Sequence, residues 1–238
     1  MPLLSMLSTI RASASAEGPY LTLTYVATAQ DSPTNNTIIH PTSVQAGDLC
    51  ILFLYGWDND SEEFLSTNRP SGFTHIMTTP DVSSTQSSIT ASYAILASTS
   101  NTDYTQPGMD SYGYVAFYYR ISGGDLDSII SLPGGTSYAA GVGDPSGQIS
   151  IPGVDSEISY ISFVASSSNA AETYHETTDV SIQQSQYAEG TTAASLGTFD
   201  IGVGEGPVGI GTAEAFSFPG APARHVHIIG GRLGFVKA

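Results

Sequence analysis

One pair of histidines in this chain has the spacing of metal ligands on a strand. His225 and His227 lie two residues apart in HVHIIGGRLGF. Side chains two apart on a strand point the same way, so both rings would share one face. A metal ion would need further ligands from elsewhere in the chain. We favour the alternative, in which the pair belongs to a polar outer face or to a subunit contact.

A second cluster that could bind a metal is acidic. The segment WDNDSEEF gathers Asp58, Asp60, Glu62 and Glu63. Calcium favours oxygen ligands at such alternating positions, but the glycine and the distant glutamate of an EF-hand loop are missing. We therefore expect a solvated acidic loop, with no bound metal.

The segment GEGPVGIG, from Gly204, contains a literal G-x-G-x-x-G pattern. A dinucleotide site needs a strand before this pattern and a helix after it. Pro207 and the strand-like segment GTAEAFSF exclude the helix. The pattern predicts instead a glycine-rich β-turn or bulge, with glycines at positive φ.

Catalytic patterns are absent from the sequence. Cys50 lies between Leu49 and Ile51, which predicts a buried, inert thiol, because reactive thiols need a polar, electropositive surround. No G-x-S-x-G segment marks a hydrolase nucleophile. Paired carboxylates for glycoside hydrolysis remain open among the 22 acidic residues, but nothing singles out a pair. We expect no enzymatic activity and no cofactor.

Composition limits the class of partner. Six Lys and Arg against 22 Asp and Glu give the 238 residues a formal net charge of -16. Nucleic-acid binding requires Lys and Arg to displace counterions from phosphates, so such a surface repels nucleic acid. No apolar run approaches the roughly 20 residues of a membrane helix. We expect neither a nucleic-acid partner nor a membrane partner.

Short strands must position the residues named so far. The segment YLTLTYVATA, from Tyr20, alternates apolar and polar residues, which predicts a half-buried strand. The segment LCILFLYGW, from Leu49, is apolar on both faces and predicts a strand covered from both sides. Further strand-like runs begin at Phe73, Ser87, Tyr112, Glu157, Asp179, Ala193, Gly209 and Arg224.

About ten strands without helical crossovers require antiparallel pairing, because parallel strands need long connections. The pattern predicts an all-β fold, an antiparallel two-sheet β-sandwich that is jelly-roll-like, with an extended N-terminal arm. The region 125–152 is rich in Gly, Pro and Ser and could mark a boundary. Because neither half alone has a complete set of strands, we expect an arm over 1–19 and one β-sandwich domain over 20–238.

The opening segment, MPLLSMLSTIRASASAEGPY, resembles a secretion signal only in part. It has small residues in an A-x-A pattern, but no Lys or Arg precedes its apolar residues, and Ser5, Ser8 and Thr9 interrupt them. We favour an anchoring arm that binds another protein; the alternative is an arm packed against its own domain. The candidate anchor residues are Leu3, Leu4, Met6, Leu7, Ile10 and Arg11.

Several segments resemble, in order, a jelly-roll-like module of bacteriophage structural proteins. They are SVQAGDLCILFLYGWDND, RPSGFTHI, ASYAILAS, AASLGTFDIGVGEGPVGIGTAEAFS and HVHIIGGRLGF, and they span about Tyr20 to Val236. The module reads as a V-x-x-G-D-L strand, a P-S-G-W/F-T turn, a Y-x-x-A strand and a glycine-rich hairpin. The opening resembles the N-terminal tag M-P-L-L-S-x-R-G-x-A-S-A-R of phage tail-fibre and minor virion proteins. It departs from that tag at MLSTI and at Glu17, where the tag has its second arginine.

The resemblance implies a phage virion structural protein, displayed as a tail-fibre, tail or capsid-decoration subunit and assembled in the host cytoplasm. It also implies that the arm joins other virion proteins and that the subunit forms a homo-oligomer, with a trimer favoured. An alternative function is a carbohydrate-binding module for a host surface glycan, with Trp57 and Asp58, or Tyr118 and Tyr119, as candidate contacts. A hydrolase of surface polysaccharide is the least favoured hypothesis.

Overall fold

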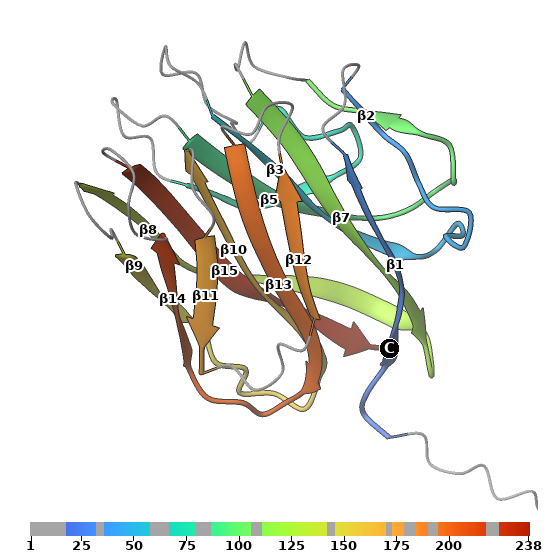
Figure 1. The fold of residues 1–238 in the computed structure, drawn as a ribbon. Helices are drawn as coiled ribbons and strands as arrows, with labels where there is room; N and C mark the ends of the chain where they lie inside the picture. Colours follow the sequence, from blue (N-terminus) through green and yellow to red (C-terminus); the bar gives the residue numbers. More distant parts are fainter. Residues whose placement is uncertain are drawn as a thin grey trace, which may run out of the picture.

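The computed structural model describes residues 18–31, 36–57, 67–79, 87–105, 111–141, 146–169, 173–178, 184–189, 195–217 and 224–238. All regular structure in these segments is β-strand (Figure 1), which confirms the all-β prediction. Within them, no helix has the length and apolarity to span a bilayer. Apart from Gly18 and Pro19, the predicted arm lies outside the described residues.

The strands are arranged in two large sheets and two small ones. They are β1 (Thr22–Asp31), β2 (Thr37–Ile38), β3 (Leu49–Trp57), β4 (Thr74–Thr78), β5 (Ser87–Ile95), β6 (Thr102–Asp103), β7 (Ser111–Ser122), β8 (Leu126–Gly141), β9 (Ser146–Ile151), β10 (Ser159–Asn169), β11 (Thr173–Thr177), β12 (Gln184–Glu189), β13 (Ser195–Glu205), β14 (Gly211–Ser217) and β15 (Arg224–Lys237).

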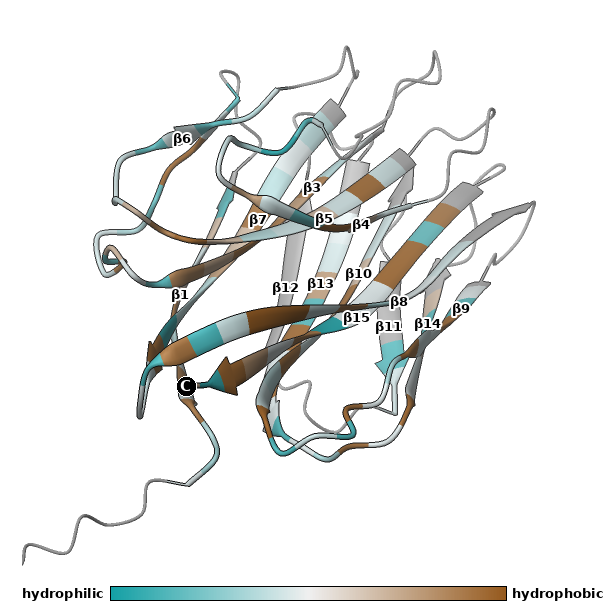
Figure 2. Ribbon diagram, turned by 180° about the vertical axis from the view of Figure 1, so that it is seen from behind, coloured by the Kyte–Doolittle hydropathy of each residue, from teal (hydrophilic) through white to brown (hydrophobic). Residues whose placement is uncertain are grey.

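Two five-stranded antiparallel sheets pack face to face. Sheet 1 has the strand order β1-β7-β3-β5-β4, and sheet 2 has the order β12-β13-β10-β15-β8. Sheet 3, with the order β11-β14-β9, covers the outer face of sheet 2, while the β2–β6 pair lies outside sheet 1 (Figures 1 and 2). Each large sheet is therefore covered on both faces, as in a sandwich with two additional outer layers.

Strand β3 shows why the sequence folds into covered sheets. Its odd-numbered side chains, including Phe53 and Tyr55, enter the core between sheets 1 and 2, while Leu52 and Leu54 enter the outer core of sheet 1. The Phe53 ring centroid lies 5.6 Å from that of Phe163 and 5.4 Å from that of Phe199, both in sheet 2. Burying each such side chain contributes about 1.5–3 kcal/mol before ordering costs. The prediction that LCILFLYGW is covered from both sides is confirmed.

The Gly-, Pro- and Ser-rich region 125–152, the alternative place for a boundary, forms β8 and β9. Its glycines allow sheets 2 and 3 to approach closely and do not form a linker. A Cβ on Gly135 would lie 2.9 Å from the Cβ of Ile149, and one on Gly134 would lie 2.6 Å from the carbonyl oxygen of Ser150. Glycine within a strand commonly marks such a close backbone approach.

The molecule has two different ends along the strand direction. At one end, Gly18 and Ala238 border the same hollow, and the Lys237 Nζ donates a hydrogen bond to the Gly18 carbonyl at 3.1 Å. At the opposite end, Trp57 is paired with Ser87 and Ser111, so three strands of sheet 1 have their ends together there. The described chain thus enters and leaves the fold at one end (Figure 1).

Candidate functional site

The predicted anchor residues lie outside the described residues, but the point where the arm joins the fold is described. Gly18 and Pro19 line a hollow of about 340 Å³ together with the C-terminal residues and Ile158. The Tyr20 hydroxyl donates to the Gly206 carbonyl at 2.7 Å, and the Ser159 hydroxyl donates to the Leu21 carbonyl at 2.5 Å. The start of the described chain is therefore fixed to sheet 2 before β1 enters sheet 1.

The predicted glycan contacts have different outcomes. Asp58 and the side chain of Trp57 lie outside what the structure describes, so that site stays a prediction. Tyr118 and Tyr119 are fully buried on opposite faces of β7, so they are wrong as glycan contacts. Burial raises the pKa of both phenols above the ordinary value. The Tyr118 hydroxyl lies 2.8 Å from the Nδ1 of His40, a contact that belongs to the outer core of sheet 1.

The histidine pair does not form a polar outer face. His227 is fully buried, because β15 lies between β10 and β8 and is covered on both sides. The side chain of His225 is not described. Among the described residues, no group of three or more His, Cys, Asp or Glu side chains could hold a metal ion.

Cys50 is buried, as its neighbours predicted. Burial raises the pKa of its thiol well above the ordinary value. Because the thiolate is the nucleophilic form, this environment keeps the sulfur unreactive.

The glycine-rich segment from Gly204 joins two strands, as predicted. β13 ends at Glu205, the Gly206–Pro207 peptide is cis, and Val208 forms a β-bridge with Val154. The expected positive φ is wrong, since these glycines are not among those with positive φ. At Gly206 the reason for glycine is lack of space, because a Cβ there would collide with the Ser156 carbonyl oxygen and lie 3.0 Å from the Cγ1 of Val154.

Three of the segments that carry the resemblance meet outside sheet 1. The Gly47 amide donates to the Leu96 carbonyl at 2.8 Å, and the Leu96 amide donates to the Asp48 carbonyl at 2.9 Å. Phe73, from RPSGFTHI, packs in the same outer core as Leu96, from ASYAILAS. These three segments, which are separate in the sequence, therefore pack together in one region of the fold.

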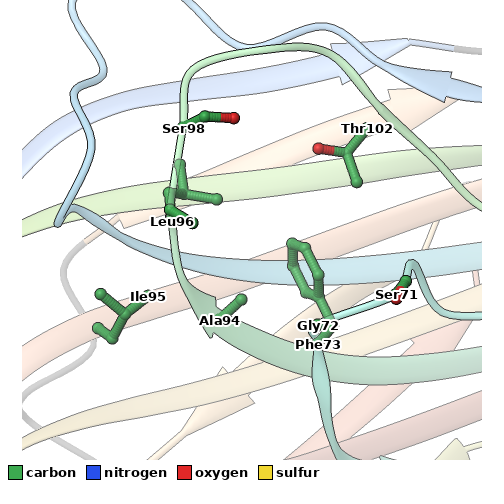
Figure 3. Close-up of a pocket in the computed structure, with 9 residues that line it drawn as sticks. Ser71, Gly72, Phe73, Ala94, Ile95, Leu96, Ser98 and Thr102 are labelled. Atoms are coloured by element: carbon green, nitrogen blue, oxygen red, sulfur yellow. The ribbon is translucent and has the colours of Figure 1, made fainter.

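A hollow of about 190 Å³ lies at this junction (Figure 3). Its floor is apolar, formed by the buried side chains of Phe73, Ala94 and Leu96. Ser98 and Thr102 place hydroxyl groups at its rim. The rim hydroxyls also form hydrogen bonds within the segment 98–102. The Thr102 Oγ1 donates to the Ser100 carbonyl at 3.3 Å, and the Ser98 Oγ accepts from the Ser100 amide at 3.4 Å.

The hollow is lined by apolar side chains and hydroxyl groups. The residues that line it are Ser71, Gly72, Phe73, Ala94, Ile95, Leu96, Ala97, Ser98 and Thr102. None of them carries a carboxylate, an imidazole or a cation, but the Nε2 of His40 lies 3.0 Å from the Thr102 Oγ1. The hollow suits a small apolar group.

Comparisons of the chain with protein-family models, with curated proteins and with solved structures find no match. The resemblance to phage structural proteins therefore rests on the sequence motifs alone.

Proposed function

We propose that this protein is a structural subunit of a bacteriophage virion, displayed on the tail or capsid and held there by its N-terminal arm. The observation that carries the proposal is the arrangement of the two ends. The chain enters the β-sandwich at the end that also holds Ala238. An arm bound to the particle would then hold this end inward and present the opposite end, where β3 ends and β7 begins, to the outside.

The arm has enough apolar surface to act as an anchor. Burying each of Leu3, Leu4, Met6, Leu7 and Ile10 contributes about 1.5–3 kcal/mol. Ordering the backbone costs about 1–2 kcal/mol per residue, so net binding also requires backbone hydrogen bonds to the partner. Arg11, one of only six cations, would fix the register by pairing with a carboxylate or carbonyl of that partner.

The net charge of -16 fits a protein displayed at high local density, because like charge opposes non-specific association between copies. Specific assembly would then depend on the arm and on a defined subunit contact. We propose a homo-oligomer, with the trimer favoured by the resemblance. Sedimentation of protein released from particles tests this state, and a monomer at all concentrations would contradict it.

The test of the anchor is deletion of residues 1–11. We expect the truncated protein to keep the melting temperature of the full chain within about 2 °C while losing at least nine-tenths of its occupancy on purified particles. Leu4→Asp combined with Leu7→Asp should have the same effect. Ser5→Asp combined with Ser8→Asp is the matched control, because it adds the same charge at polar positions of the arm.

Two outcomes would contradict the anchor. Full occupancy of the truncated protein would show that the arm is not the attachment. Unfolding of the truncated protein would show that the arm belongs to the core of its own domain.

A further inference from the structure

Sheet 3 presents a polar outer face. Its inward side chains, including Ala213, Ala215 and Ile149, are buried against the apolar outer face of sheet 2. Because side chains alternate along a strand, the residues between them point away from the molecule. These outward residues are Gln148, Ser150, Glu176, Thr178, Thr212 and Glu214.

The strand register places these side chains in two rows. Glu214 on β14 is the partner of Gln148 on β9 and of Glu176 on β11, which gives a row of one amide and two carboxylates across three strands. Thr212 and Thr178 lie in the adjacent row. The Thr212 amide donates to the Thr178 Oγ1 at 2.9 Å, and the Thr178 amide donates to the Thr212 carbonyl at 2.9 Å.

A hollow of about 270 Å³ lies between these rows. Its lining consists of Gln148, Glu176, Thr177, Thr178, Thr212, Ala213 and Glu214. Ligand pockets for drug-sized molecules have volumes of about 300–1,000 Å³. The hollow is therefore suited to one or two small polar rings, and the open face of the sheet allows a longer chain to continue from it.

The two facing carboxylates are electrostatically unfavourable in the free protein. Like charges directly opposite on neighbouring strands destabilise a sheet. Within the described segments, no ion pair and no hydrogen bond is found that engages the carboxylate of Glu176 or Glu214. A ligand that donates hydrogen bonds to both carboxylates would relieve this repulsion.

The chemistry of the lining selects the ligand class. Two carboxylates repel anions, and the polar side chains do not favour an apolar ligand. The described residues near the hollow do not provide the three or more His, Cys, Asp or Glu ligands of a metal site. An uncharged polyhydroxylated ligand fits each group: its hydroxyls donate to Glu176 and Glu214, and the Gln148 amide can both donate and accept.

We infer that the outer face of sheet 3 binds a neutral glycan, with Glu176, Glu214 and Gln148 as the contact residues. This inference goes beyond the virion role and does not depend on it. It also places glycan recognition on a different part of the chain from Trp57 and Asp58.

The experiment measures binding of the full chain to an array of uncharged hexose and N-acetylhexosamine oligosaccharides, followed by titration calorimetry with the strongest hexamer. Heparin, oligolysine and CaCl₂ are the anionic, cationic and metal probes. We expect binding to at least one neutral oligosaccharide and no binding to heparin. Glu176→Gln combined with Glu214→Gln should weaken that binding at least tenfold, and Gln148→Ala should weaken it severalfold.

Glu205→Gln is a control, because it makes the same type of substitution once, at an exposed position at the end of β13, and should leave binding unchanged. The double variant should also melt about 1–3 °C higher than the wild type, since the facing charges are gone. This second readout separates lost binding from lost folding.

Three results would overturn the inference. One is a wild-type protein that binds none of the neutral oligosaccharides. Another is binding that the double variant leaves unchanged. The third is binding confined to oligolysine or Ca²⁺, which would assign the carboxylates to a cation.

Discussion

The outer layers of the two large sheets are each fastened by one arginine, and the two arginines are held in different ways. Arg120 on β7 fastens the segment before β3 to the outer face of sheet 1. Arg232 on β15 fastens the connections of sheet 3 to the outer face of sheet 2. Arg120 is partly exposed and Arg232 is buried, so the two sites compare the same type of side chain in two environments of one fold.

Arg120 forms a bidentate ion pair with one carboxylate. Its Nε and Nη2 donate to the Asp48 Oδ1 and Oδ2, each at 2.9 Å, and Nη2 also approaches the Ser43 carbonyl at 3.4 Å. The Arg120 side chain is 42% exposed and that of Asp48 is 3% exposed. The hydrogen bonds to Asp48 raise the pKa of Arg120, and they also compensate for the burial of the carboxylate.

Arg232 is 1% exposed, and the contacts described for it are to uncharged groups. Its Nε donates to the Ser162 hydroxyl at 2.8 Å, while its Nη1 donates to the carbonyls of Pro152 and Gly209. The guanidinium carbon lies 5.1 Å from the centre of the Tyr160 ring. The arginine thereby joins the connection after β9 and the connection before β14 to the centre of sheet 2.

The difference shows that solvent access determines how many hydrogen-bond acceptors the protein must provide for a guanidinium group. A partly exposed guanidinium keeps water on its open side, so one carboxylate is sufficient. A buried one must have an oxygen near its N–H groups, because unpaired buried donors are costly. The outer layer of sheet 2 should consequently depend on its arginine more than the outer layer of sheet 1 does.

The largest expected effect follows replacement of the buried arginine. Arg232→Met keeps the length of the side chain but leaves the buried Ser162 hydroxyl and the carbonyls of Pro152 and Gly209 without this donor. We expect the free energy of unfolding to fall by about 3 kcal/mol, as measured by urea denaturation. Arg232→Lys should lie between this variant and the wild type, because it keeps the charge but loses the fork of donors.

Lys237→Met is the control for that change, since it removes a cation that is only partly buried and donates to the Gly18 carbonyl. It should change the stability by less than about 0.5 kcal/mol. Equal decreases in the free energy of unfolding for Arg232→Met and Lys237→Met would show that the contribution of Arg232 to stability does not come from its burial.

A smaller effect is expected at the partly exposed pair. Asp48→Asn removes the charge while keeping one acceptor for Arg120 and for the Gln45 amide, which donates to the Asp48 Oδ2 at 2.9 Å. We expect a loss of about 1–2 kcal/mol by urea denaturation, and this loss should shrink in 1 M NaCl. Asp155→Asn, at an exposed position, is the control. A loss at Asp48 larger than that of Arg232→Met would reverse the comparison.

The smallest effect is a pH dependence on the sheet 1 side. Burial lowers the pKa of His40 and of His75 below the ordinary 6.5, so the unfolded state takes up a proton first as the pH falls. The stability contributed by the neutral rings is fully present above pH 6.5 and is lost as the pH falls through the folded-state pKa values. The free energy of unfolding should therefore be lower at pH 5.5 than at pH 7.5, and His40→Gln should reduce this difference. Greater stability at pH 5.5 than at pH 7.5 would contradict the assignment.

Local patterns in the sequence predicted the central strands of the fold, because the alternation of apolar and polar residues indicates which faces of a strand are buried. The nine residues from Leu49 formed a strand with two apolar faces, as expected. The glycines of β8 left a domain boundary open as an alternative, since close packing between sheets and a flexible linker both favour glycine.

The long-range contacts could not be predicted from the sequence. Arg120 and Asp48 are 72 residues apart, and Arg232 and Pro152 are 80 residues apart, so no local pattern links them. The register shift between Ile229 and Gly231 places an extra residue of β8 between Thr136 and Pro133, and simple alternation along β8 does not predict this change. For the same reason, the facing pair Glu176 and Glu214 on sheet 3 appears only once β11 and β14 are aligned.

The adjacency of Gly18 and Ala238 has a consequence for protein engineering. A short linker between these positions could join the two ends of the sandwich, and new ends could then be opened between Thr105 and Ser111, which follow β6 and begin β7. Circular permutation succeeds mostly where the original ends are close together. Such a permuted chain would carry a fused cargo at the end of the sandwich opposite the arm's point of attachment.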